Sequence, residues 1–201
     1  FAGVVQIHLQ RVLGDPRTLL QVDASELRAL MESRGGLITL EEALVRFPNT
    51  RFNIDVKADT AVQAVGLIVA SHAERVLLTA FSDARRRTAM AAIMRAGANQ
   101  RPAASPGTFT VVKLVIAVWL RARWLAARTL RGIDAVQIPE RQGRLRVLSP
   151  RLIAMAHELG IEVHVWTVNE SDDMRRLLDA GVDGIVTDRA DVALQVVAER
   201  K

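Results

Sequence analysis

The chain has 201 residues, a net charge of +5 and no cysteine. Half of its residues are hydrophobic, and we expect one folded domain over residues 1–201. The absence of cysteine excludes a disulfide framework, a thiolate zinc site and a thiol nucleophile. This composition is compatible with the cytoplasm, where we expect the protein, with the membrane periphery as a second location.

Taken in chain order, apolar runs typical of β-strands alternate with segments that carry helix-capping residues. Helices are expected over 25–32 and from Thr39 onward, and a third between Ser149-Pro150 and Gly160. Strands interleaved with helices predict an α/β fold with a parallel sheet. The expected strands are 4–8, 52–57, 76–81, 135–138, 161–168 and 184–187.

The segment 161–191 is the most informative part of the sequence, because it reads as strand, helix, strand. The first strand is followed by Asn169, which we expect to cap the helix, and by Asp172 in its first turn. Gly181 then ends the helix before the strand that leads to Thr187. This pattern predicts a βαβ unit with buried parallel strands.

Several strings along the chain resemble the glycerophosphodiester phosphodiesterase family, in the family's order. They are ITLEEAL at 38–44, FNIDVK at 52–57, VLLTAFS at 76–82, VWTVN at 165–169 and LLDAGVDGIVTDR at 177–189. The resemblance implies a (β/α)8 TIM barrel and hydrolysis of glycerophosphodiesters or lysophospholipids to an alcohol and glycerol 3-phosphate.

The resemblance begins late, so we expect a barrel that is incomplete at its N-terminus. A barrel of this kind takes about 250 residues. The family's opening His-Arg, Glu-Asn-Thr and Glu-x-Asp motifs are absent from these 201 residues. We therefore expect the first two βα units to be missing and these 201 residues alone to be inactive, while the full gene product is an enzyme.

The start of the chain carries two candidate site residues. The family has a catalytic His-Asp followed two residues later by Leu-x-Arg, whereas His8 runs directly into Leu9. His8 is therefore either the catalytic histidine, a general acid or base, or only the residue that precedes Leu9. Arg11 is a candidate phosphate contact in the same register.

Asp55 and Lys57 alternate with apolar residues and are expected to face the barrel interior. One interpretation is a core ion pair, because a buried carboxylate needs a partner. By resemblance, Asp55 stands where the family has a metal-binding Glu, and Lys57 where it has a phosphate-contacting Lys. The implied cofactor is a divalent metal, Ca2+ or Mg2+, both of which take oxygen ligands.

Three further residues are candidates for substrate binding. Trp166 resembles the tryptophan that lines the family's glycerol pocket, although it could equally fill the barrel. Phe81 and Gln137 lie at or near strand ends, where barrel active sites are found, and each either contacts substrate or packs. His164 shares a strand face with Trp166 and is expected to be a satisfied interior histidine.

Positive charge gathers in one stretch, since residues 84–133 carry ten Lys or Arg and no Asp or Glu. Within it, 108–131 is predicted to be a basic, apolar helical insertion. Wound as one helix, it places Lys113, Arg121, Arg128 and Arg131 within an arc of roughly 80°. Three interpretations remain: a barrel helix with a solvated basic face, an interfacial helix at an anionic membrane, or, least supported, a nucleic-acid contact.

Three functional hypotheses follow from the whole sequence. The first is the metal-dependent phosphodiesterase, acting on a small-molecule glycerophosphodiester or lysophospholipid and not on nucleic acid. The second is a degenerate, non-catalytic barrel that binds membrane surfaces or protein partners. The third, another phosphate-handling barrel enzyme, is disfavoured because fold alone would not predict the strings VWTVN and FNIDVK.

Overall fold

The computed structural model describes residues 22–200, and their contacts divide into two units, 22–49 and 50–200. The expected strand at 4–8, with His8 and Arg11, lies outside the described residues. The expected single domain over 1–201 stays a prediction.

The smaller unit consists of short helices whose starts are fixed by capping side chains. Helix α2 spans Ala24–Met31 and is capped by Asp23, and it continues into a 3-10 turn, η2 (Glu32–Arg34). Helix α3 spans Leu40–Arg46 and begins with a capping box in which Thr39 and Glu42 bond each other's backbone N–H. Both predicted helix starts are confirmed to within one residue.

In the larger unit, the first sheet is parallel and has the strand order β1-β2-β3. Strand β1 spans Phe52–Asp55, β2 Val76–Thr79 and β3 Ala103–Ala104. The sequence predicted the first two but missed β3, because two residues carry no periodicity. The intervening helices are η3 (Asp59–Ala61), α4 (Val62–Val69), η4 (Ala70–Arg75) and α5 (Asp83–Arg95).

The second sheet is also parallel, with the order β4-β7-β8. Strand β4 spans Ala135–Pro139, β7 Glu162–Trp166 and β8 Gly184–Ile185. The three predicted strands are confirmed, with β4 one residue longer than predicted and β7 and β8 shorter. A two-stranded hairpin, β5 (Arg141–Gln142) and β6 (Leu145–Arg146), follows β4. The helices are α8 (Pro150–Glu158), α9 (Ser171–Asp179) and α10 (Ala190–Ala198).

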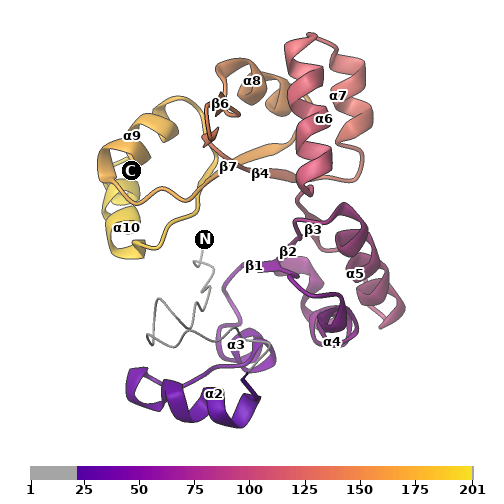
Figure 1. Cartoon of the computed structure of the whole chain (residues 1–201), viewed down its shortest axis with the longest axis vertical. Helices are drawn as coiled ribbons and strands as arrows, with labels where there is room; N and C mark the ends of the chain where they lie inside the picture. The colour runs from indigo at the N-terminus through magenta and orange to yellow at the C-terminus, as the bar shows by residue number, and fades with distance from the viewer. Residues whose placement is uncertain (1–21, 201) are drawn as a thin grey trace. The chain divides into compact units, whose positions relative to one another are not determined.

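One acidic residue joins the two sheets. The backbone N–H of Asp134 donates to Ala104 O at 2.9 Å, and its side chain accepts from Ala104 N at 2.8 Å. Asp183 binds Val163 in the same two-way manner, so an aspartate before each of β4 and β8 anchors that strand to its neighbour. Residues 22–200 thus contain two three-stranded parallel sheets that are linked at Ala104 and Asp134, and they do not close a barrel. Figure 1 shows β1, β2 and β3 in the first sheet and β4 and β7 in the second.

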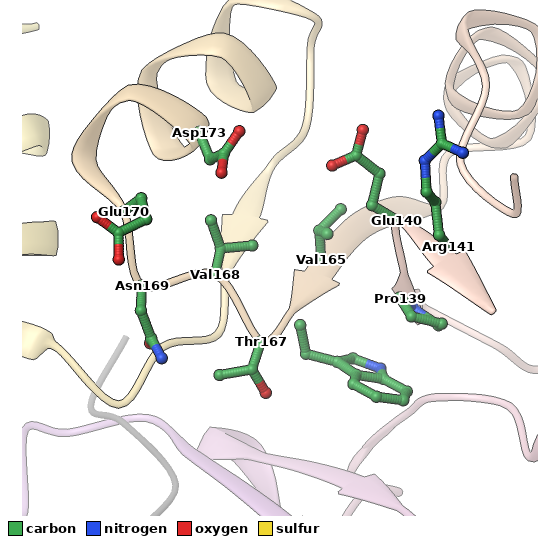
Figure 2. Close-up of a pocket in the computed structure, with 10 residues that line it drawn as sticks. Pro139, Glu140, Arg141, Val165, Thr167, Val168, Asn169, Glu170 and Asp173 are labelled. Carbon is green, nitrogen blue, oxygen red and sulfur yellow. The ribbon is translucent and has the colours of Figure 1, made fainter. Parts of the chain in front are cut away.

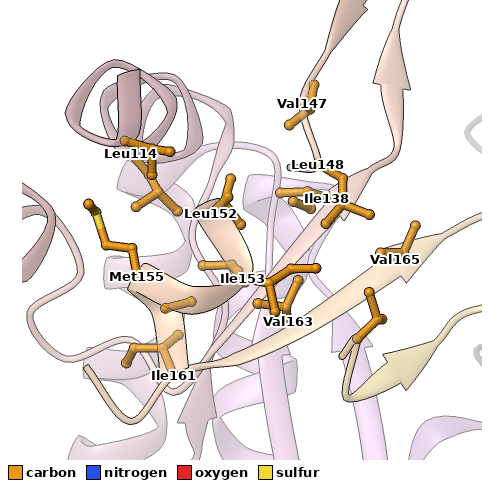
Figure 3. Close-up of a cluster of buried hydrophobic side chains, with 14 of the residues drawn as sticks. Leu114, Ile138, Val147, Leu148, Leu152, Ile153, Met155, Ile161, Val163 and Val165 are labelled. Carbon is orange, nitrogen blue, oxygen red and sulfur yellow. The ribbon is translucent and has the colours of Figure 1, made fainter. Parts of the chain in front are cut away.

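The largest buried cluster covers the second sheet. Figure 3 shows side chains from α6, β4, α8 and β7 meeting there, among them Leu114, Ile138, Leu152 and Val163, each with essentially no exposed surface. Burying a side chain of this size contributes roughly 1.5–3 kcal/mol. The apolar runs in strands and helices therefore form one core that fixes the strand ends.

The predicted single helix over 108–131 is wrong, because the chain forms two helices there. Helix α6 spans Thr108–Trp119 and α7 spans Arg123–Thr129. Arg121 between them adopts a left-handed φ of 56°, which ends α6. The basic residues after Trp119 therefore do not continue the arc of Lys113. Among the described residues, no helix is long and apolar enough to cross a membrane.

Candidate functional site

The candidate side chains lie at the carboxyl ends of parallel strands. Asp55 is the last residue of β1, Phe81 follows β2 by two residues, and Trp166 is the last residue of β7. Parallel strands bring their carboxyl ends to one edge, where open α/β sheets and barrels bind ligands. The structure thus places three of the predicted residues at the carboxyl ends of parallel strands or just after them.

Asp55 and Lys57 form an ion pair, with Asp55 Oδ2 at 3.4 Å from Lys57 Nζ. The Asp55 side chain is 17% exposed, and its other oxygen, Oδ1, is buried without a hydrogen-bond partner among residues 22–200. Asn53 Oδ1, two residues earlier in β1, is also buried and has no partner in this range. Because residues i and i+2 of a strand share a face, two oxygen acceptors stand unsatisfied beside one ammonium group.

Phe81 and Trp166 meet edge to face, with ring centroids 6.4 Å apart and planes at 78°. This is a favoured aromatic geometry. Phe81 remains 62% exposed, so one side of the pair faces solvent. The contact connects the end of β2 with the end of β7 and forms an aromatic wall beside the strand ends.

The loop that carries Phe81 is held by Asp83, the first residue of α5. Asp83 accepts hydrogen bonds from Gly107 N at 3.0 Å and from the backbone and hydroxyl of Thr110, while Thr108 N donates to Phe81 O at 2.9 Å. Burial raises the pKa of the Asp83 carboxyl, but these hydrogen bonds outweigh it and leave the pKa below its usual range. Sequence reasoning missed this link, because 24 residues separate Asp83 from Gly107.

Gln137 faces a buried polar layer. Its Nε2 lies 3.5 Å from His164 Nδ1, and its backbone N–H donates to Ser105 Oγ at 3.3 Å. His164 Nε2 lies 2.9 Å from a Glu162 carboxylate oxygen, and the His164 side chain is buried. His164 is thus the satisfied interior histidine that was expected, and the substrate contact of Gln137 stays a prediction.

A pocket of about 400 Å3 opens at the ends of β4 and β7. Figure 2 shows Glu140 and Arg141 on one side of it, and Glu170 and Asp173 on the other. Glu140 and Asp173 both bind Arg176, at 2.8 Å, and the hydrogen bond from Arg176 lowers the pKa of Glu140. Trp166 also lines this pocket. Arg141, Glu170 and Asp173 were not anticipated as lining residues, since Arg141 lies in the short strand β5 and the other two lie at the start of α9.

Asn169 has a different role from the one expected. Helix α9 has Glu170 as its N-cap residue, with no side-chain cap. Instead, Asn169 Oδ1 accepts from Thr187 Oγ1 and from Asp188 N, each at 2.9 Å. The predicted helix cap is therefore wrong: the acceptor is used to join the segments that follow β7 and β8.

The described residues do not by themselves form a metal site. Within 22–200, no group of three or more His, Cys, Asp or Glu side chains is arranged to hold a metal ion. The unsatisfied oxygens of Asp55 and Asn53 are nevertheless the hard donors that Ca2+ and Mg2+ prefer. These two oxygens are suited to serve as two of the ligands of such an ion.

A family model decides the relationship of this chain to known proteins. Residues 7–192 match the model of the glycerophosphoryl diester phosphodiesterase family. The chain belongs to this family. Membership makes it a relative of phosphodiester hydrolases and confirms the resemblance seen in its strand motifs.

Individual relatives agree with that assignment. The chain is 42% identical over 164 residues to a probable glycerophosphodiester phosphodiesterase 2 of Mycobacterium tuberculosis, covering 81% of this chain and 60% of that protein. It is 38% identical over 48 residues to a glycerophosphodiester phosphodiesterase of Caldanaerobacter subterraneus, covering 24% of this chain and 20% of that protein. The chain thus spans about 60% of the length of the mycobacterial relative.

Solved structures support the fold. A glycerophosphodiester phosphodiesterase from Thermotoga maritima matches 94% of this chain and 75% of its own chain, with a TM-score of 0.60 at 18% identity. One from Parabacteroides distasonis matches 83% and 66%, with a TM-score of 0.55 at 20% identity. The expected α/β barrel-type fold is confirmed, and the chain covers part of these structures.

Proposed function

We propose that the protein is a metal-dependent hydrolase that cleaves glycerophosphodiesters, or lysophospholipids, to an alcohol and glycerol 3-phosphate. The observation that carries the proposal is the half-satisfied Asp55 beside Lys57 at a strand end, within the family's strand motif. A buried carboxylate oxygen without a partner is costly unless a ligand or ion completes it. The relatives' names support this substrate class.

Each named residue has a role in the proposed reaction. Asp55, with Asn53 beside it, would hold Ca2+ or Mg2+, which when bound neutralises phosphodiester charge. Lys57 adds a positive contact to the phosphate. Phe81 and Trp166 line the pocket that binds the glycerol moiety, and Gln137, on β4, contacts the substrate. We assign His8 to general acid–base catalysis and Arg11 to a phosphate contact, with their positions outside the described residues.

A second candidate function follows from the small number of possible metal ligands among the described residues. Because no group of three metal-binding side chains occurs within residues 22–200, a non-catalytic barrel that binds surfaces or partners is the alternative. Under this alternative, the Asp55–Lys57 pair is a core ion pair only.

An assay of glycerol 3-phosphate release distinguishes the phosphodiesterase from the non-catalytic barrel. The full product of the open reading frame and the 201-residue chain would be assayed on glycerophosphocholine, glycerophosphoethanolamine and a lysophospholipid, with Ca2+, with Mg2+ and with EDTA. We expect metal-dependent release by the full product and none by the 201 residues alone. No release by the full product with either ion would favour the non-catalytic barrel.

A further inference from the structure

Helix α6 turns an apolar face to solvent. Phe109, Val112, Ile116, Trp119 and Leu120 are all exposed, and their spacing of three or four residues places them on one side of the helix. Trp119 is 77% exposed and Trp124, at the start of α7, 72%. A surface helix normally exposes its polar face, whereas the solvent-facing side of α6 is apolar.

The packing of α6 on the rest of the unit does not use this face. Its inner face, formed by Leu114, Ala117 and Val118, is buried. The helix contacts α5, α7 and α8, and Figure 1 shows α6 and α7 side by side as a hairpin. The apolar face of α6 thus remains exposed although the helix already packs against α5, α7 and α8. We call α6, α7 and the turn 120–122 the α6–α7 hairpin.

Basic residues surround the exposed apolar side chains. Lys113 Nζ lies 4.3 Å from the centre of the Phe109 ring, and Arg121 occupies the turn between Trp119 and Trp124. Within the described range, no ion pair is found for Lys113, Arg121, Arg128 or Arg131. Residues 84–133 contain no acidic residue, and Glu158 on α8 pairs with Arg123 at 3.5 Å, so the hairpin itself carries a net positive charge.

We propose that the α6–α7 hairpin docks on an anionic lipid surface. Trp119, Leu120 and Trp124 would lie at the boundary between headgroups and acyl chains, which is where tryptophan is favoured. Arg121, Arg128 and Arg131 would bind lipid phosphates, each contributing an attraction that falls off within a Debye length. The contact is peripheral, because no helix in the described range could span a bilayer.

Charge favours a lipid surface over a second copy of this chain. Two copies meeting through this hairpin would bring the same basic residues against one another without an acidic partner in 84–133. An anionic surface instead complements the charge and accepts the apolar side chains. The proposal does not depend on the proposed hydrolysis, because it rests on exposure and charge alone.

Vesicle binding tests the proposal with the purified full chain. The chain has three tryptophans, so Trp166→Phe leaves Trp119 and Trp124 as its only indole reporters. We expect co-sedimentation and a blue shift of tryptophan emission with vesicles of phosphatidylcholine and phosphatidylglycerol. Neither is expected with phosphatidylcholine alone, and salt at about 0.5 M, several times the physiological concentration, should weaken binding.

Two sets of variants identify the surface. Trp119→Ser with Trp124→Ser should reduce the vesicle partition coefficient by about tenfold or more. The matched control is Leu67→Ser with Leu194→Ser, which removes equally exposed apolar side chains from α4 and α10 and should leave binding unchanged. Arg121→Gln with Arg131→Gln should reduce binding about fivefold per charge, against Arg51→Gln with Arg144→Gln as control.

Three results would overturn the proposal. They are equal binding to neutral and anionic vesicles, hairpin variants that bind as well as their controls, and a stable dimer in sedimentation that the tryptophan variants dissociate. The last outcome would assign the hairpin to contact between two copies. Circular dichroism of each variant establishes that the fold is retained before binding is compared.

Discussion

Asp55 and Lys57 form a pair in which only half of the carboxylate is used. Lys57 Nζ reaches Asp55 Oδ2 at 3.4 Å, whereas Oδ1 is buried and lacks a hydrogen-bond partner in the part of the chain that the structure describes. An ion pair that served stability alone would be expected to satisfy both oxygens, because an unpartnered buried oxygen costs about 1–3 kcal/mol. The unpartnered oxygen at the end of β1 therefore supports the metal role proposed for Asp55.

Replacing Lys57 should impair substrate turnover more than folding. Lys57 is half exposed, so Lys57→Met should change the free energy of unfolding by less than about 1 kcal/mol. If Lys57 contacts the phosphate, kcat/KM for a glycerophosphodiester should fall by roughly 10²-fold. Lys57→Arg, which keeps the charge, should recover part of this loss in the full gene product. An equal loss of stability and activity in Lys57→Met would instead assign the lysine to the core.

The aromatic pair should show a measurable coupling energy. Phe81→Ala, Trp166→Ala and the double variant form a double-mutant cycle. Each single substitution removes the edge-to-face contact, so the cycle measures its coupling energy. We expect a coupling of about 0.5–1.5 kcal/mol in chemical denaturation. Phe81→Ala with Trp119→Ala serves as the unlinked control and should be additive. A coupling near zero for Phe81 and Trp166 would mean that the contact does not persist in solution.

Gly107 should tolerate no side chain. A Cβ at this position would lie 2.7 Å from both Asp83 N and Phe81 O, which are backbone atoms. Gly107→Ala should therefore shift the loop that carries Phe81 and destabilise the protein by about 1–3 kcal/mol. Thr108→Ala, an exposed neighbour, is the control and should change stability by less than about 0.5 kcal/mol. Thermal unfolding of both variants makes the comparison, and equal midpoints would contradict the predicted close approach.

Asp134 should stabilise the junction between the two sheets in a pH-dependent way. Its removal leaves the buried Ala104 N without a partner, so Asp134→Ala should cost about 1–3 kcal/mol at pH 7, against little change for the exposed Asp172→Ala. Urea denaturation measures the free energy of unfolding of both variants.

The pH dependence of Asp134 has a definite sign. Burial raises its pKa, but hydrogen bonds from Arg101 and Ala104 outweigh this and hold the pKa below its ordinary value. A depressed folded-state pKa stabilises the protein above the unfolded pKa of about 3.9, and this contribution is lost as pH falls through the folded value. The stability gap between wild type and Asp134→Ala should therefore narrow below about pH 4. A gap that widens on acidification would contradict this assignment.

The local parts of the fold were predictable from the sequence. The capping box at Thr39, the proline at the first position of α8 and the apolar run of β7 each carry their signal within a few residues. The glycerophosphodiester phosphodiesterase family was likewise recognisable from short strings at strand ends. Asp55 and Trp166 were singled out by their resemblance to the family's strand motifs, and Phe81 by its place at a strand end. The structure places all three at the carboxyl ends of parallel strands or just after them, and their roles stay predictions.

Other features depend on contacts between distant residues and left no local signal. Asp83 binds Gly107 and Thr110 across the chain, and Asn169 binds Thr187 and Asp188 instead of capping α9. Periodicity also could not show that the chain leaves α6 at Arg121, because the apolar pattern continues through the turn. Tertiary hydrogen bonds and one left-handed residue decided these points.

The most direct test of the proposed function is the activity of Asp55→Asn in the full gene product. Asparagine keeps the size of the side chain but removes the charge that would bind the metal ion. We expect release of glycerol 3-phosphate from glycerophosphocholine to require Ca2+ or Mg2+ and to fall at least about 10²-fold in Asp55→Asn, with thermal stability nearly unchanged. Metal-dependent release that is undiminished in Asp55→Asn would contradict the assigned role of Asp55.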